Sequence, residues 1–345
     1  MKLGLDIGYS GAQIALPMEQ IHKAEDLGFD TVWTAESYGS DAFTPLAFIA
    51  AQTQRIRLAT GIVQLAARSP TNCAMTAQTL EALAGSGRLI VGLGLSGPQI
   101  VEGWYGQPWG KPATRLRDYV AIMRKVWRRD GPVSHDGDEI CLPYSGPDAT
   151  GLGKPLKSIL HGNPAIPIML GTSTPGNIRL TGEIADGWLS MHVTPAQLPG
   201  HLLQLAKGLA LRSDGKSLKD LEIVAALSVI QTQDVQAALS AMKPATALYV
   251  GGMGAKDKNF HKDAMIARGF AAEAERVQEL YLAGYKDEAA AAVPDAYLDE
   301  GALIGPADRI AERYPAWRDS GFTTLRLTKA TIPAMETVAR LARAD

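Results

Sequence analysis

Short apolar runs alternate with longer amphipathic segments along most of the 345-residue chain, and this alternation strongly limits what the chain can fold into. Helical spacing of apolar residues is clear, for example, over Arg115–Arg129. The runs that we expect to be strands are Lys2–Ile7, Thr31–Ala35, Ile56–Thr60, Leu89–Gly94, Ile166–Leu170, Gly187–Met191, Leu221–Thr232 and Thr323–Leu327. Strands that alternate with helices pair in parallel through right-handed crossovers. Eight of them predict the α/β class and a closed (β/α)8 TIM barrel.

The chain is longer than the ~250 residues of a typical barrel, and the excess falls in two places. Residues 131–167 are rich in turn formers and predict an insertion after the fourth strand, with a hairpin around Val133–Leu142. Residues 249–294 predict a largely helical insertion after the seventh strand. Because we find no Pro/Ser-rich linker between them, we favour one domain over residues 1–345 rather than two domains.

Composition excludes several classes of protein. The formal net charge of -2 gives no electrostatic footprint for nucleic acid, and two cysteines are too few for a disulfide framework. The amino terminus does not read as a signal peptide, and no apolar stretch approaches the ~20 residues of a membrane helix. The six histidines lack metal-site spacing, so we expect no metal. We therefore expect a cytoplasmic protein without a membrane partner.

In a barrel the active site lies at the carboxyl ends of the strands, so the residues that follow each strand are the main candidates for the site. The turn Gly171–Asn177 leads from the fifth strand into a helix, with Thr174 in position to cap it and Pro175 at its first position. Free N–H groups at such a helix start suit a phosphate group. An ordinary capped helix explains the same residues equally well.

Other strand ends carry less specific signals. The run Gly92–Gly97 matches G-x-G-x-x-G, but it lies on the fourth strand, which argues against a dinucleotide site. These glycines instead permit close backbone approach to a flat ligand, or simple turns. Glu36 follows the second strand and is either an acid/base residue or a surface carboxylate. His192 follows the sixth strand and is either a proton carrier or a plain loop histidine.

Several of these segments together resemble the luciferase-like flavin and deazaflavin oxidoreductases, in particular their actinobacterial coenzyme F420-dependent branch. The segments that carry the resemblance are Asp30–Tyr38, Arg57–Ile62, Arg88–Gly94, Ser96–Trp104, Ala185–Trp188, Tyr249–Gly254 and Asn259–Phe260. The resemblance implies a barrel with a deazaflavin in its mouth. It also implies a cis peptide bond at Gly61–Ile62. Ser37 stands where some relatives have a proton-handling His.

The resemblance and the strand-end positions together define the expected site. Catalytic candidates are Glu36 and Tyr9. The expected cofactor-binding residues are Asp6, Glu36, Ser37, Gly61, Ile62, Ser96, Gly97, Gly171, Thr172, Ser173, Thr174 and Gly176.

Three functions are compatible with these residues. The first is an F420-dependent oxidoreductase that transfers a hydride between the deazaflavin C5 and a small organic substrate. The second is an FMN-dependent monooxygenase that works with a separate flavin reductase. The third is a non-catalytic F420- or flavin-binding protein, suggested by Ser37 in place of the His. We favour the first, and the family resemblance also implies a homodimer.

Overall fold

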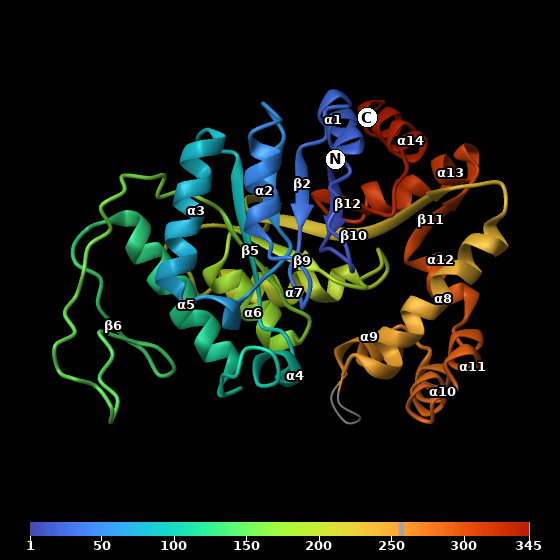
Figure 1. Cartoon of the computed structure of the whole chain (residues 1–345). Coiled ribbons are helices and arrows are strands. Elements are labelled where there is room, and N and C mark those ends of the chain that lie inside the picture. The colour runs from blue at the N-terminus through green and yellow to red at the C-terminus, as the bar shows by residue number, and fades with distance from the viewer. Residues whose placement is uncertain (255–258, 345) are drawn as a thin grey trace.

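The computed structural model describes residues 1–254 and 259–344. Eight parallel strands form a closed barrel, which lies at the centre of the molecule (Figure 1). The strands follow one another around the barrel in the order β1, β2, β3, β5, β8, β9, β10 and β12, and β12 pairs with β1 to close it. Their bounds are β1 Lys2–Gly8, β2 Thr31–Thr34, β3 Arg57–Thr60, β5 Leu89–Gly94, β8 Ile168–Gly171, β9 Gly187–Ser190, β10 Glu222–Gln231 and β12 Thr324–Thr328. The predicted TIM barrel is confirmed, and each strand overlaps its expected run.

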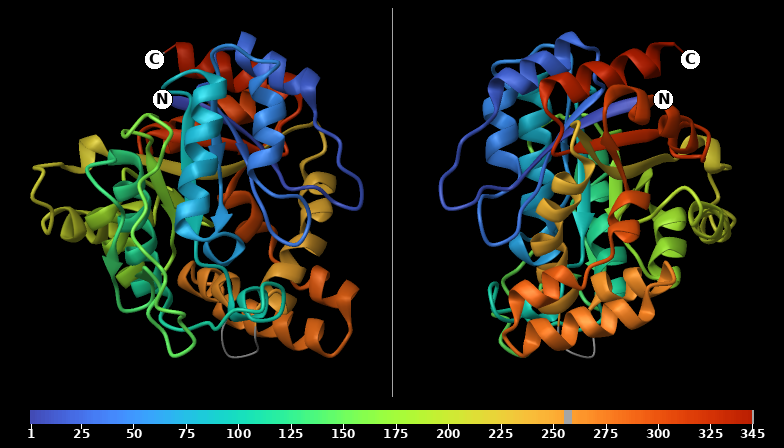
Figure 2. Two further views of the ribbon diagram at one scale, coloured as in Figure 1. Left: turned by 60° about the vertical axis from the view of Figure 1, so that its left-hand side comes forward. Right: turned by 90° about the vertical axis from the view of Figure 1, so that its right-hand side faces the viewer.

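Helices cover the outside of the barrel, as its alternating sequence predicts (Figure 2). Their bounds are α1 Met18–Asp26, α2 Phe43–Ala50, α3 Pro70–Ala84, α5 Pro112–Arg128, α6 Pro175–Ile184, α7 Leu198–Leu209, α13 Ala307–Arg318 and α14 Ile332–Arg343. Two short elements lie near strand ends, β4 at Val63–Gln64 and α4 at Pro98–Val101. Short 3-10 turns span Leu65–Ala67 and Leu218–Asp220.

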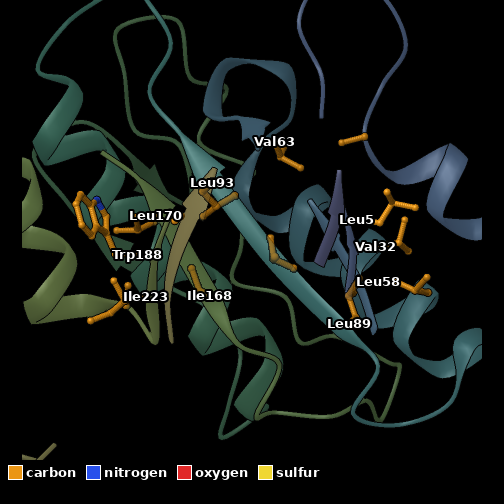
Figure 3. Close-up of a cluster of buried hydrophobic side chains, with 14 of the residues drawn as sticks. Leu5, Val32, Leu58, Val63, Leu89, Leu93, Ile168, Leu170, Trp188 and Ile223 are labelled. Carbon is orange, nitrogen blue, oxygen red and sulfur yellow. The ribbon is translucent and has the colours of Figure 1, made fainter. Parts of the chain in front are cut away.

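Strand residues alternate between two buried layers, as the two-residue period of a strand requires. Val32, Leu58 and Leu89 point outward into the layer between strands and helices (Figure 3). Their neighbours point inward and form a separate cluster that fills the barrel, namely Trp33, Ala59, Ile90, Met169, Leu189 and Val224. The barrel is therefore packed along its axis, and a ligand must bind at an end.

The first insertion connects α5 to β8. It contains an antiparallel hairpin of β6 (His135–Asp136) and β7 (Cys141–Leu142), which lies inside the predicted hairpin region. Asn163 donates a 2.7 Å hydrogen bond to Glu81 of α3, so the end of this insertion runs along the outer helices.

The second insertion separates β10 from the last part of the barrel. Its helices are α8 Val235–Gly252, α9 Phe260–Ala267, α10 Ala271–Leu282, α11 Lys286–Ala291 and α12 Asp295–Glu300. They share their own hydrophobic core, which includes Val250, Met265, Val277 and Leu298. In Figures 1 and 2, α9, α10 and α11 lie at the same end of the barrel as α4, whereas both termini lie at the opposite end.

Sequence reasoning missed two strands, the two-residue β4 and the longer β11. β11 (Ala302–Gly305) follows the helical insertion and pairs in parallel with the last four residues of β10, Ser228–Gln231. β10 is long enough to pair with β9 and β12 in the barrel and with β11 beyond them. A run of four apolar residues carries too little periodicity to distinguish a strand from a buried helical turn.

Candidate functional site

Glu36 follows β2 at the carboxyl end of the barrel, but its carboxylate is buried and fully engaged. The backbone N–H groups of Gln64 and Ala42 donate to it at 2.8 and 3.1 Å, and Arg68 contacts it at 2.9 Å. Arg68 also pairs with Asp41 at 3.3 Å. The Glu36 carboxylate therefore joins the loops after β2 and β3, and these contacts favour a positioning role over proton transfer.

Gly61 and Ile62, the residues after β3, lie across this end of the barrel, and we call the surface that they form with Gly94 and Gly171 the floor. The Gly61–Ile62 peptide bond is cis, as the resemblance implies. The Ile62 side chain lies over the ends of β5 and β8, where a Cβ on Gly94 or Gly171 would come within 2.7 or 3.0 Å of it. The glycines at these two strand ends thus leave room for Ile62. This packing accounts for one glycine of the G-x-G-x-x-G match without a dinucleotide.

Asp6 and Arg326 lie beneath this floor as an ion pair at 3.3 Å. Arg326 also donates a 3.3 Å hydrogen bond to the carbonyl of Gly61 and lies 5.7 Å from the ring centroid of Trp33. Asp6 accepts a further hydrogen bond from the N–H of Gly8. Of the two partners, only Asp6 was selected from the sequence. An arginine in the last strand gave no signal there, because its partner is 320 positions away in the chain.

The turn after β8 leads into α6 as predicted. Thr174 accepts a hydrogen bond from the N–H of Asn177, and Pro175 is the first helical residue. The Thr172 hydroxyl is buried and shares a 2.7 Å hydrogen bond with Thr181, so it is already engaged. Ser173 is exposed, and no atom lies within 4 Å of the space beside Gly176. The helix start is therefore accessible through Ser173 and Gly176 rather than through Thr172.

The loops after β2 and β5 reach the helical insertion at Met253. Gln99, two residues beyond Gly97, donates a 2.8 Å hydrogen bond to the Met253 carbonyl. The Tyr38 hydroxyl lies 3.8 Å from the Met253 sulfur, and Ser37 beside it is half-buried. Ser96, next to Gly97, has a positive φ of 59°. The predicted residues Ser37, Ser96 and Gly97 thus belong to loops that meet the end of α8.

Four aromatic side chains connect further strand ends to the same insertion. The Tyr9 hydroxyl, after β1, bonds to Tyr249, and this contact adds to burial in raising the pKa of Tyr249. The Tyr249 ring packs edge-on against His261, with centroids 4.7 Å apart. His261 Nδ1 lies 3.0 Å from Nε2 of His192, after β9. The insertion therefore covers the carboxyl end of the barrel, which is contacted by the loops after β1, β2, β5 and β9.

Sequence reasoning considered His192 but did not select Tyr249 or His261. Asn259 connects them: its side chain donates to the carbonyls of Tyr249 and Val250 and accepts from the N–H groups of His261 and Lys262. The available signal was the residue type of Asn259, since Asn is a preferred N-cap, but its burial shows only in the fold.

Across residues 1–254 and 259–344, no group of three or more His, Cys, Asp or Glu side chains is arranged to hold a metal ion. None of the helices in those same residues is long and apolar enough to cross a membrane.

The comparisons with known proteins define the family. The model described as luciferase-like monooxygenase matches residues 2–324, and the chain belongs to this family. A putative coenzyme F420-dependent oxidoreductase of Mycobacterium tuberculosis is 46% identical over 343 residues, which cover 99% of each chain. A 5,10-methylenetetrahydromethanopterin reductase of Archaeoglobus fulgidus is 26% identical over 87% of this chain and 85% of its own length.

Solved structures share the fold. The coenzyme F420-dependent tetrahydromethanopterin reductase from Methanopyrus kandleri matches with a TM-score of 0.78 at 22% identity, over 98% of this chain and 97% of its own. An F420-dependent secondary alcohol dehydrogenase, solved with an F420–acetone adduct, matches with a TM-score of 0.75 at 17% identity, over 99% and 98%. At these identities the likeness concerns the fold.

Proposed function

We propose that this chain is an oxidoreductase that binds coenzyme F420 and transfers a hydride between the cofactor and a small organic substrate. The observation that carries the proposal is 46% identity, over 99% of both chains, to a relative named as a putative F420-dependent oxidoreductase. The residues at the carboxyl end of the barrel fit such a cofactor. The helix start at Ser173 and Gly176 suits its phosphate, because free N–H groups and the helix dipole favour an anion.

The floor at Ile62 suits a flat ring. Ile62 is fixed over the ends of β5 and β8, and the Gly61 carbonyl is held by Arg326 beneath it. When bound, F420 supplies the hydride chemistry at C5. The protein binds its phosphate, orients its ring against Ile62 and handles any proton that accompanies the hydride. Glu36 holds the loops around the ring in place through Arg68, Gln64 and Ala42.

Titration of the purified protein with F420 and, separately, with FMN tests the cofactor. We expect saturable binding of F420, measured by the change in its fluorescence, and weaker or no binding of FMN. Micromolar binding of FMN with none of F420 would refute the proposal and favour an FMN-dependent monooxygenase. Tight F420 binding without turnover on alcohols, carbonyl compounds and alkenes would favour a non-catalytic binding protein.

We also propose that the protein acts as a cytoplasmic homodimer. Large apolar side chains are exposed on α2 and α3 and on the neighbouring insertion, among them Phe48 (53% exposed), Met75 (56%), Leu83 (77%) and Ile159 (92%). The helices α2 and α3 pack together and Asn163 of the insertion bonds to α3, and exposed apolar side chains on adjoining elements suit a protein–protein interface. Light scattering should show a dimer, and Leu83→Glu should shift it toward monomer. A monomer at all accessible concentrations would overturn this part.

A further inference from the structure

His192 and His261 come from distant parts of the chain and meet at the carboxyl end of the barrel. His192 follows β9, and His261 is the second residue of α9. Nε2 of His192 lies 3.0 Å from Nδ1 of His261, and the two rings cross at 75°. At this distance the two nitrogens share one proton in an N–H···N hydrogen bond.

Surrounding contacts hold the pair in place. The buried Asn259 side chain fastens the last turn of α8 to the first turn of α9. The Tyr249 ring packs against His261 from one side, and Tyr9 bonds to Tyr249. His192 itself has a positive φ of 60°, an uncommon conformation for a residue other than glycine. Such a backbone persists only where the surroundings fix it.

The pair is neutral and accessible. Burial lowers the pKa of His261 to about 4, and the surrounding protein and the charges of His261 and Arg268 lower the pKa of the more exposed His192 as well. Arg268 is itself paired with Glu300 at 3.1 Å. Although protein surrounds His192, its side chain is exposed, and the neighbouring Met191 is 43% exposed. His192 is therefore accessible to solvent beside the end of β9.

A neutral histidine pair that shares one proton always has one free acceptor nitrogen and one free N–H donor at its two outer ends. A proton accepted at Nδ1 of His192 can move on, because Nε2 of His192 passes its own proton to Nδ1 of His261. His261 then releases its Nε2 proton. The pair returns to a neutral state with both tautomers exchanged, so no lasting buried charge is created.

We propose that His192 and His261 form the proton relay for oxidation of a small neutral alcohol to its carbonyl compound, and for the reverse reduction. This inference rests on the proposed F420-dependent function. The C–H bond of the carbinol carbon breaks, and its electron pair leaves with the hydrogen as the hydride that F420 accepts. The hydroxyl O–H bond breaks, its proton passes to Nδ1 of His192, and its electron pair forms the C=O bond. The relay delivers one proton to solvent.

The alternatives at the same end of the barrel are less suited to this step. Glu36 is buried and already accepts hydrogen bonds from two backbone N–H groups and Arg68. Ser37 lacks a group that titrates near neutral pH. A neutral pair of imidazoles also matches an uncharged hydroxyl or carbonyl oxygen, which accepts or donates one hydrogen bond without needing a counter-ion.

The test compares wild type with His192→Asn, His261→Asn and the double variant. Asn tolerates the positive φ at position 192 and removes the imidazole. His22→Asn is the matched control, since His22 is exposed on α1 and contacts only the Gln52 carbonyl among the bonds of the described residues. Each protein is assayed for F420 binding by fluorescence and for F420 reduction by propan-2-ol and cyclohexanol. Ring ¹⁵N spectra of the cofactor-free protein report the protonation of the two histidines.

We expect each single variant to bind F420 within about threefold of wild type and to lose about 10²-fold in kcat. The double variant should lose no more than either single variant, because a relay fails as a unit. Added imidazole should restore part of the His192→Asn activity, which a merely structural role would not allow. The ¹⁵N spectra should show both rings neutral at pH 7.

Contrary outcomes separate the two proposals. If wild type oxidises the alcohols and both single variants stay within about threefold in kcat, the relay is wrong. Protonated rings at pH 7 would also overturn it. If wild type binds F420 but neither oxidises these alcohols nor reduces cyclohexanone with reduced F420, the substrate class is wrong and the relay falls with it. Failure of wild type to bind F420 at all would refute the proposed function itself.

Discussion

The two sides of the barrel's carboxyl end differ in how they carry polar groups. Around β1, β2 and β3 the polar groups are charged and paired: Glu36 with Arg68, and Asp6 with Arg326. Where the loop after β9 meets the helical insertion, the bonded pairs are imidazole and phenol groups, His192 with His261 and Tyr9, after β1, with Tyr249, beside the ion pair of Arg268 and Glu300. Each charged group on the first side is already neutralised, whereas the second side keeps nitrogens that can still exchange protons.

This difference suggests that one side holds the loops in place and the other side handles protons. A buried ion pair that also receives backbone hydrogen bonds holds a loop strongly, because removing one partner leaves the other buried and uncompensated. A neutral histidine pair contributes less to stability but can pass a proton along without keeping a charge. We therefore assign the shape of the cofactor floor to the β1–β3 side and the handling of protons to the β9 side.

The largest expected effect comes from breaking the charged side. Glu36→Ala should lower the free energy of unfolding by about 3 kcal/mol, because it leaves Arg68 and two buried N–H groups without their acceptor. Urea denaturation measures this loss. His192→Asn, the matched change on the β9 side, should cost less than 1 kcal/mol. Equal losses would erase the distinction between the two sides.

A second prediction concerns the floor between them. Gly94→Ala would place a Cβ within 2.7 Å of the Ile62 side chain and displace it. We expect about tenfold weaker F420 binding, which corresponds to about 1.4 kcal/mol, measured by fluorescence titration. Gly200→Ala is the control, since no atom lies within 4 Å of the added Cβ on α7. Unchanged affinity in Gly94→Ala would place the ring elsewhere.

A third prediction concerns how the free energy of unfolding depends on pH through the histidine pair. The unfolded chain has histidine pKa values near 6.5, whereas burial holds the pKa of the half-buried His261 near 4 in the folded protein. Below pH 6.5 the unfolded state therefore binds protons that the folded state does not, and stability falls as the pH drops toward 4. Unfolding free energies measured from pH 7 to pH 4 should fall less steeply in the double variant His192→Asn/His261→Asn. Parallel slopes would contradict a neutral, desolvated His261.

The barrel was predictable from the sequence because its signal is local and repeated. Each strand has its own apolar run, and each helix has its own helical spacing of apolar residues. Eight such local patterns together indicate the barrel. The capping of α6 by Thr174 was predictable for the same reason, since cap, proline and helix are adjacent in the chain.

The site was less predictable because its contacts join residues that are far apart in sequence. Glu36 was selected by its place after a strand, but only the fold shows that Arg68 and two backbone N–H groups already engage it. Thr172 was selected as a hydroxyl donor, but only the fold shows that its hydroxyl is already bonded to Thr181, which lies within α6. His192 and His261 are 69 positions apart, and nothing in either local sequence indicates that they meet.

The smallest expected effect concerns the junction between the two sides. Gln99, after β5, donates a 2.8 Å hydrogen bond to the carbonyl of Met253 at the end of α8, and this bond ties a barrel loop to the insertion. An exposed hydrogen bond of this kind contributes about 0.5–1.5 kcal/mol at most. Gln99→Ala should therefore barely change global stability. It should instead speed hydrogen exchange at the end of α8, because local opening depends on the few bonds that hold a segment.

The same substitution tests whether the two sides act independently. If the insertion only covers the barrel, faster exchange at α8 in Gln99→Ala should leave the ¹⁵N signals of His192 and His261 unchanged, because Asn259 still fastens α9 to α8. Changed histidine signals would mean that the β5 loop sets the geometry of the pair from across the barrel. In that case the β1–β3 side and the β9 side would be one coupled unit, and the assignment of support to one and chemistry to the other would have to be given up.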